Sequence, residues 1–232
     1  MPDVRKLLAE KLSGGLSGWF QNLAAQNLHS ETGEDSARVV AVQILNAQNR
    51  YKVEASTLPQ NWGVSKRRID VAIKGRSQDA QGWYGAVELK WITGDSDWHQ
   101  IRLQIIQDIV RLGFVETSNL CANFLVIGGT RECLYSLFDE AHPHSPEREQ
   151  RRVLFDRLLY RDINHPTSHL LHTELEHCFL KFEERVPEAV FDGFDGRLKA
   201  ELLARNVAYI GQTEVGSVCI WQCKRTRGSA GG

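Results

Sequence analysis

The sequence predicts an α/β protein in which helices flank a mixed sheet. A helix pattern over residues 32–49 is followed by three stretches rich in β-branched and aromatic residues, at 51–55, 68–74 and 83–92. A second helix pattern covers 98–114, and the unbroken apolar run 124–127 after it is typical of a buried central strand. This order of helix, three strands, helix and strand predicts a sheet covered by helices.

Both long helix patterns carry apolar side chains at helical spacing. The first is predicted to begin at Thr32, which can cap a helix, and continues through Ala37, Ala41 and Leu45. The apolar face of the second is formed by Ile101, Ile105, Ile109 and Leu112. Residues 75–82 are polar and turn-rich, so the strands on either side of them are expected to form a hairpin.

The chain divides into a predicted core and two flanking parts. Residues 1–28 are expected to form an N-terminal helical segment that is interrupted at Gly14, Gly15 and Gly18. Residues 29–130 form the predicted core, and 131–227 a C-terminal α/β extension of the same domain. This extension is expected to hold helices at 131–140, 148–161, 174–185 and 195–206, a loop at 141–150, and closing strands at 207–210 and 217–223. Residues 228–232 read as a flexible tail.

Composition narrows the class of protein. The 232 residues are 42% hydrophobic and 25% charged, which is the balance of a globular protein. Because the net charge is −1, binding of nucleic acid would require a local basic patch. The five cysteines are odd in number and include no Cys-x-x-Cys pair, which favours free thiols in a reducing compartment. No apolar run reaches the roughly 18 residues that span a bilayer, so we expect a cytoplasmic protein with no membrane partner.

The candidate chemical centre lies on the second and third predicted strands. Alternation along a strand places Glu88 and Lys90 on one face, with Leu89 on the other. Asp70 lies on the neighbouring strand of the predicted hairpin, about 5 Å across the pair. Two carboxylates and one ammonium group are therefore expected to converge. The alternative is an ordinary surface ion pair, since Glu-x-Lys is common and such a pair contributes under about 1 kcal/mol.

This set of groups suits a hard divalent cation. Mg²⁺ prefers oxygen ligands, and Asp70, Glu88 and the Leu89 carbonyl can supply three of them, with Mn²⁺ as a substitute. A bound metal lowers the pKa of water and offsets charge on a phosphate oxygen. Lys90 would orient or deprotonate that water and stabilise the negatively charged transition state. These parts together predict phosphodiester hydrolysis.

The segments Arg68-Ile69-Asp70-Val71-Ala72-Ile73 and Val87-Glu88-Leu89-Lys90-Trp91 resemble the motif of the PD-(D/E)xK superfamily. Ile69 stands where that motif often has proline. The resemblance covers about residues 30–128 and implies a restriction-endonuclease-like αβββαβ core. It also implies a metal-dependent nuclease, with DNA as the expected partner and restriction-type defence as the expected setting. The chain would act as a homodimer or as a subunit of a defence complex.

The same resemblance implies a glutamate on the first helix, and Glu34 is the matching candidate, with Glu31 as the alternative one turn earlier. A purely structural role also fits Glu34, because acidic residues in the first turn stabilise a helix. On the helix after the motif, Gln100, Gln104 and Asp108 recur along one face. Gln104 is a candidate nucleic-acid contact, although a structural role fits it too, and Asp108 is expected to pair with Arg111 or a neighbouring strand.

A basic run leads directly into the strand of Asp70. This run is expected to bind a phosphate backbone through Lys66, Arg67 and Arg68. The alternative is that these side chains form a solvated run of charges with no ligand. The leading function is a DNA endonuclease. The alternative is a catalytically inactive nuclease-fold protein that binds nucleic acid or serves as an assembly subunit. The sequence leaves open DNA or RNA, strandedness and sequence preference.

Overall fold

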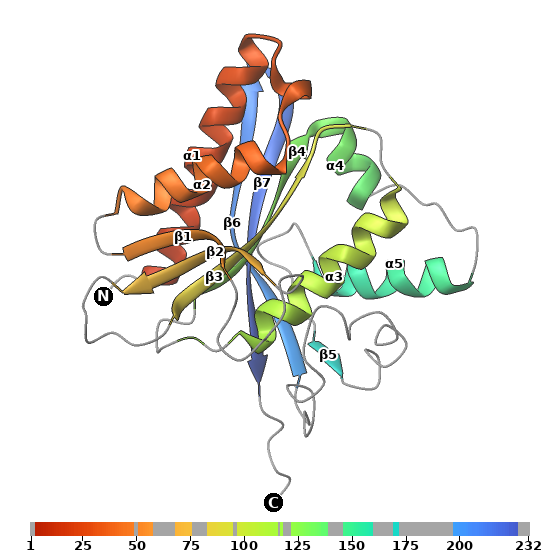
Figure 1. The fold of residues 1–232 in the computed structure, drawn as a ribbon. Coiled ribbons are helices and arrows are strands. Elements are labelled where there is room, and N and C mark those ends of the chain that lie inside the picture. The colour runs from red at the N-terminus through yellow and green to blue at the C-terminus, as the bar shows by residue number, and fades with distance from the viewer. Residues whose placement is uncertain are drawn as a thin grey trace, which may run out of the picture.

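The structure is a computed structural model that describes residues 3–48, 51–57, 68–75, 83–94, 97–115, 117, 122–138, 146–159, 169–171 and 197–226. In this part of the chain, seven strands form one mixed sheet in the order β1-β2-β3-β4-β7-β6-β5 (Figure 1). The strands are β1 Tyr51–Thr57, β2 Ile69–Gly75, β3 Trp83–Ile92, β4 Ala122–Thr130, β5 His169–Leu171, β6 Arg197–Ile210 and β7 Thr213–Thr226. The helices are α1 Val4–Ala25, η1 His29–Glu31, α2 Glu34–Asn46, α3 Trp98–Phe114, α4 Arg131–Phe138 and α5 Pro146–Leu158.

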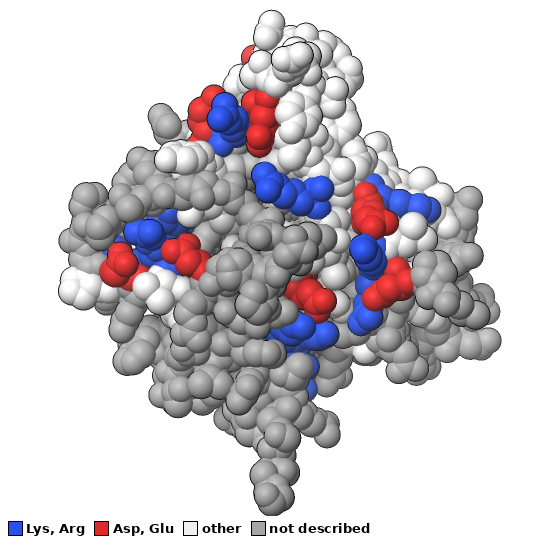
Figure 2. Space-filling view, turned by 180° about the vertical axis from the view of Figure 1, so that it is seen from behind, with Lys and Arg blue, Asp and Glu red and all other residues white. Residues whose placement is uncertain are grey.

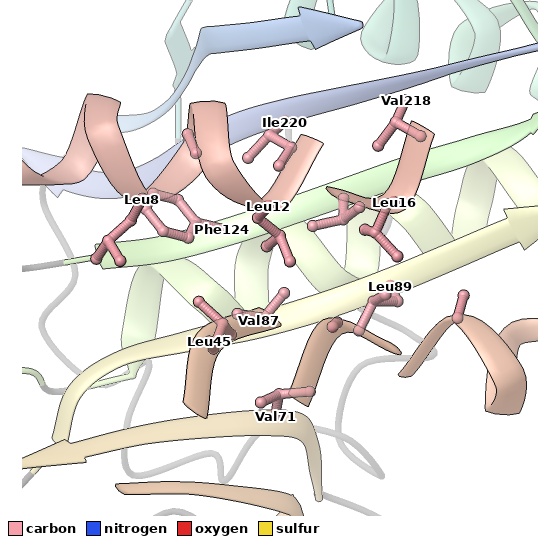
Figure 3. Packing of buried hydrophobic residues seen from close by; sticks show 14 of the residues in the cluster. Leu8, Leu12, Leu16, Leu45, Val71, Val87, Leu89, Phe124, Val218 and Ile220 are labelled. Atoms are coloured by element: carbon pink, nitrogen blue, oxygen red, sulfur yellow. The ribbon is translucent and has the colours of Figure 1, made fainter. Parts of the chain in front are cut away.

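Helices cover both faces of the sheet. On one face, α1 and α2 pack on the central strands, and Leu8, Leu12 and Leu16 of α1 lie over Phe124 and Ile220 (Figure 3). On the other face, α3, α4 and α5 enclose a second apolar cluster with β4, β6 and β7. Alternation along each strand supplies both clusters, which is why the central strands are apolar throughout.

The predicted order of helix, three strands, helix and strand is confirmed between residues 34 and 130. Strands β1, β2 and β3 pair antiparallel, and α3 then carries the chain across so that β4 runs parallel to β3. Asp97 begins α3 by accepting hydrogen bonds from the amides of His99 and Gln100, at 3.1 and 3.3 Å. This crossover sets α3 against the face of β3 that carries Glu88 and Lys90.

The predicted break in the N-terminal helix is wrong, because α1 is one continuous helix of 22 residues through Gly14, Gly15 and Gly18. A Cβ at Gly15 would lie 2.6 Å from Cδ1 of Ile44, so this glycine permits a close approach of α1 and α2. Packing against α2, β6 and β7 outweighs the poor helix propensity of glycine.

No helix in the described ranges is long and apolar enough to cross a membrane.

The predicted helix over 195–206 is also wrong, since this segment belongs to the long strand β6. Ala200, Ala204 and Ala208 are buried at a spacing of four, which fits the period of a helix and that of a strand equally well. A register shift between Leu202 and Ala204 transfers the buried residues from the α3 face to the α1 face. Hydrogen-bonded pairing with β7 along the whole of β6 favours the strand over the helix.

Several boundaries differ from their predicted places. Helix α2 begins after Gly33 rather than at Thr32, and β4 continues through Gly128 and Gly129 instead of ending there. Helix α5 begins at Pro146, inside the predicted loop, and α4 ends at Phe138. The predicted helix over 174–185 and the tail at 228–232 lie outside the described residues.

Gly129 provides a test of the close pairing between β3 and β4. Its φ is 158°, and a Cβ there would collide with the carbonyl oxygen of Ile92 on β3. We expect Gly129→Ala to lower the free energy of unfolding by about 3 kcal/mol or more, measured by urea denaturation. Gly14→Ala is the control, because nothing lies within 4 Å of its added Cβ and alanine favours a helix by about 1 kcal/mol. If Gly129→Ala were as stable as the wild type, the β3–β4 register would be incorrect.

Candidate functional site

The candidate site lies where β2 begins and β3 continues beyond it. The two strands pair at Val71 and Val87, and β2 starts at Ile69, whereas β3 runs on to Ile92 beside β4. The segment before α2 packs along this extension of β3. The indole Nε1 of Trp91 donates to Thr32 Oγ1 at 3.3 Å, and Thr93 Oγ1 donates to the Thr32 carbonyl at 2.8 Å. The first turn of α2 is thereby held next to Lys90.

Asp70, Glu88 and Lys90 converge in the structure as their strand positions predict. Val87 and Leu89 face the α1 side of the sheet, so the alternating Glu88 and Lys90 face α3. Oδ2 of Asp70 accepts a hydrogen bond from the Leu89 amide at 2.8 Å, which ties the two strands together at the site. The amide and the carbonyl of one strand residue point to the same side, so the Leu89 carbonyl also faces the β2 side of β3.

Lys90 joins the strands to two helices. Its Nζ lies 3.4 Å from Glu34 Oε2 at the start of α2 and 3.2 Å from Asp108 Oδ2 on α3. Glu31, the alternative to Glu34, is exposed in η1. The glutamate that reaches the cluster is therefore Glu34, and it does so as the first residue of α2, directly after the N-cap residue Gly33.

Arg111 compensates the most deeply buried carboxylates. Its Nη2 lies 2.5 Å from Glu88 Oε1 and 2.8 Å from Asp108 Oδ1, one turn earlier on α3. Glu88 is 1% exposed and Asp108 0%, so both charges depend on protein partners rather than on water. The predicted pairing of Asp108 with Arg111 is confirmed, and Asp108 contacts the neighbouring strand as well, through Lys90.

Arg38 is the third cation of the cluster. It follows Glu34 by one turn on α2, and its Nη2 lies 3.0 Å from Asp70 Oδ1 and 3.5 Å from Glu34 Oε1. Its Nη1 lies 2.6 Å from Asp35 Oδ1. The motif residues thus lie in one ionic cluster of four carboxylates and three cations, formed by Glu34, Arg38, Asp70, Glu88, Lys90, Asp108 and Arg111.

Burial and neighbouring charges together shift the pKa values of the cluster. Burial raises the pKa of Glu88 well above its usual range, although Arg111 opposes this shift. Burial also raises the pKa of Glu34, against the charge of Lys90. For Lys90 itself, burial acts to lower the pKa, but the carboxylates of Asp108 and Glu34 outweigh it, so the pKa lies above the usual range of lysine. Lys90 is consequently charged at neutral pH.

The donor set fits a hard divalent cation at Asp70. Oxygens of Asp70 and Glu34, which come from different elements, already share one cationic atom, Nη2 of Arg38. Glu88 Oε1 is buried and makes no hydrogen bond, despite its short ion pair with Arg111. In the described residues, no three acidic, histidine or cysteine side chains are grouped closely enough to hold a metal by themselves. Waters would therefore complete the coordination, as Mg²⁺ commonly requires.

The predicted nucleic-acid contacts are only partly described. Lys66 and Arg67 lie outside the described residues. Arg68 is exposed, and its Nη1 donates to the carbonyl oxygen of Ser56 at 2.5 Å. Gln104 is half-buried one turn before Asp108, and among the described residues no hydrogen bond joins its side chain to the cluster. Seen from behind, basic side chains are interspersed with acidic ones on the surface (Figure 2).

The sequence motif did not reveal Arg38, and it gave Arg111 only as a partner of Asp108. Glu34 and Arg38 are four residues apart, which places them on one helix face and is the signal that could have drawn attention to Arg38. Arg111 follows Asp108 by three residues on an otherwise apolar helix face. Such a buried pair of opposite charges requires further partners, and the strand motif supplies them.

Comparisons of the chain with family models, with curated proteins and with solved structures found no match.

Proposed function

We propose that this protein is a Mg²⁺-dependent nuclease that hydrolyses phosphodiester bonds in DNA. The observation that carries the proposal is the convergence of Asp70, Glu88 and Lys90 with Glu34. The PD-(D/E)xK pattern implies this convergence, and the residues come from three different elements, β2, β3 and α2. The element order around them, helix, three strands, helix and strand, also supports a restriction-endonuclease-like core. Asp70 would hold the metal together with the Leu89 carbonyl and with Glu34 or Glu88.

The residues of the site divide the chemistry among them. Mg²⁺, when bound, would supply acidity to water and charge to a phosphate oxygen. Lys90 stays protonated, so we retain two of its three predicted roles, orientation of the attacking water and stabilisation of the transition state, and not deprotonation of the water. Glu34 is better suited to accept the proton of that water, because burial raises its pKa and it is more exposed than Glu88.

A second function has one observation in its favour. Arg38 and Arg111 already pair with Asp70 and Glu88, so the carboxylates are compensated without any metal. A nuclease-fold protein that had lost activity and kept nucleic-acid binding or an assembly role would have this arrangement. The two functions differ in whether a divalent cation enters the cluster.

The nuclease proposal is tested by incubating the purified chain with supercoiled plasmid, linear duplex and single-stranded DNA. Each substrate is tested with Mg²⁺, with Mn²⁺ and with EDTA. We expect cleavage with either metal and none with EDTA, because water activation requires the cation. Structured and unstructured RNA in the same assay would decide the class of nucleic acid.

Asp70→Asn is the control for contaminating nucleases. It keeps the size of the side chain and its acceptor for the Leu89 amide but removes the charge that binds the metal. Equal cleavage by Asp70→Asn and the wild type would assign the activity to a contaminant. Absence of cleavage on every substrate, with retained DNA binding, would establish the inactive nuclease-fold function instead.

A further inference from the structure

Arg38 differs from the other two cations of the cluster in its surroundings. Its side chain is 23% exposed, and its guanidinium contacts three carboxylates, those of Glu34, Asp35 and Asp70. Lys90 and Arg111 are more deeply buried and contact Asp108, which is inaccessible to solvent. Loss of either would remove part of the compensation of buried carboxylates, whereas Arg38 borders the solvent.

We propose that Arg38 is a displaceable cation that occupies the metal position in the metal-free protein. Its Nη2 lies between oxygens of Asp70 and Glu34, where a divalent ion would be held. A metal and Arg38 therefore compete for the same carboxylates. This inference rests on the proposed function, because it takes Asp70 as a metal ligand.

Asp35 gives the displaced guanidinium a second partner. It is 92% exposed, one residue after Glu34 on α2, and its Oδ1 lies 2.6 Å from Arg38 Nη1. Arg38 can thus leave Asp70 and Glu34 without losing its ion pair with Asp35. The movement transfers a charged group from a half-buried position toward water, which lowers its desolvation cost.

Displacement also places Arg38 where a substrate would be bound. A guanidinium at the rim of the site presents a planar fork of donors that matches two phosphate oxygens. The same residue would hold the carboxylates together without metal and contact the phosphate with metal. Without metal, Arg38 would act through the carboxylates of Asp70 and Glu34, and with metal it would bind the substrate directly.

Competition makes metal binding weaker than the carboxylates alone would allow. The apparent affinity equals the intrinsic affinity multiplied by the fraction of molecules in which Arg38 has left Asp70. We expect Arg38→Gln to bind Mn²⁺ about tenfold more tightly than the wild type, because glutamine keeps a polar side chain and carries no charge. Asp35→Asn should act in the opposite direction and weaken Mn²⁺ binding several-fold. Without the Asp35 charge, the displaced position of Arg38 is less stable, so Arg38 remains paired with Asp70 in more of the molecules.

The experiment is a titration of the purified full chain with Mn²⁺, followed by electron paramagnetic resonance of the free ion and by calorimetry. The variants are Arg38→Gln, Asp35→Asn and Asp70→Asn, with Arg5→Gln as the matched control. Arg5 also pairs with an aspartate at the start of a helix, Asp3 at 2.8 Å, but on α1. Arg5→Gln should leave the affinity unchanged, and Asp70→Asn should abolish specific binding.

The outcomes separate this inference from the proposed function. Wild-type Mn²⁺ binding that requires Asp70 but is unchanged or weakened in Arg38→Gln would overturn the competition and leave the nuclease proposal intact. Absence of Asp70-dependent binding in both the wild type and Arg38→Gln would overturn both. If Arg38→Gln proves too unstable to titrate, Asp35→Asn decides the question, because its side chain is almost fully exposed and its removal leaves the fold intact. Unchanged or tighter binding by Asp35→Asn would overturn the competition.

Discussion

Replacing Arg111 with leucine should lower the free energy of unfolding by about 3–5 kcal/mol, one of the two largest effects that we expect of any substitution in this cluster. Arg111 Nη2 contacts both Glu88 and Asp108, and these carboxylates are 1% and 0% exposed. Leucine would fill part of the space but leave Glu88 without its ion pair in a region that excludes water. Urea denaturation followed by circular dichroism measures the loss.

Two controls show whether the loss comes from buried charge. Arg5→Leu removes an exposed ion pair with Asp3, and it should change stability by less than about 1 kcal/mol. Combining Glu88→Gln with Arg111→Leu should recover part of the stability, because the uncompensated charge is then gone. A loss below about 1 kcal/mol for Arg111→Leu alone would mean that Glu88 is protonated or solvated in the folded protein.

Replacing Lys90 with alanine should reduce DNA cleavage roughly 100-fold or more while DNA binding persists. Lys90 would act on the attacking water and on the transition state, so its removal raises the barrier without removing the groups that contact phosphates elsewhere. Single-turnover cleavage with Mg²⁺ measures the rate. Binding is measured separately on the same duplex by fluorescence anisotropy in EDTA.

Lys74→Ala is the matched control for Lys90→Ala. Lys74 lies on β2 and its Nζ is 2.6 Å from Glu54 Oε2, so it is also a strand lysine in an ion pair, but away from the site. Its replacement should leave the cleavage rate unchanged. Since Lys90 also compensates Asp108, the folded fraction of Lys90→Ala must be determined at the assay temperature. Equal rates for Lys90→Ala and the wild type would move the activity to another site or to a contaminant.

The strand motif was predictable from the sequence because its geometry is local. The period of two along β3 is sufficient to place Glu88 and Lys90 on one face, and a hairpin is sufficient to bring Asp70 beside them. The apolar residues of β2, β3 and β4 mark these strands as buried, and the observed bounds of β3 coincide with the predicted ones. The approach of Glu34 depended on the resemblance rather than on the residues alone.

Other features depended on contacts between distant parts of the chain. Arg38 reaches Asp70 across 32 positions, and nothing in the sequence near either residue indicates that pair. The continuity of α1 follows from its packing on β6 and β7, which lie near the other end of the sequence. In β6 the alanine spacing fits two periods, so only pairing with β7 distinguishes strand from helix.

The place of β7 in the sheet has a consequence for synthesis of the chain. β7 pairs with β4 on one side and β6 on the other, and α1 packs against both β6 and β7. While the ribosome is still adding residues before 213, the apolar strand β4 has no second neighbour and the apolar side chains of α1 have no complete surface to cover. Segments far apart in the sequence, α1 and β7, must therefore meet before the sheet closes, and such long-range pairing folds slowly and leaves aggregation-prone intermediates.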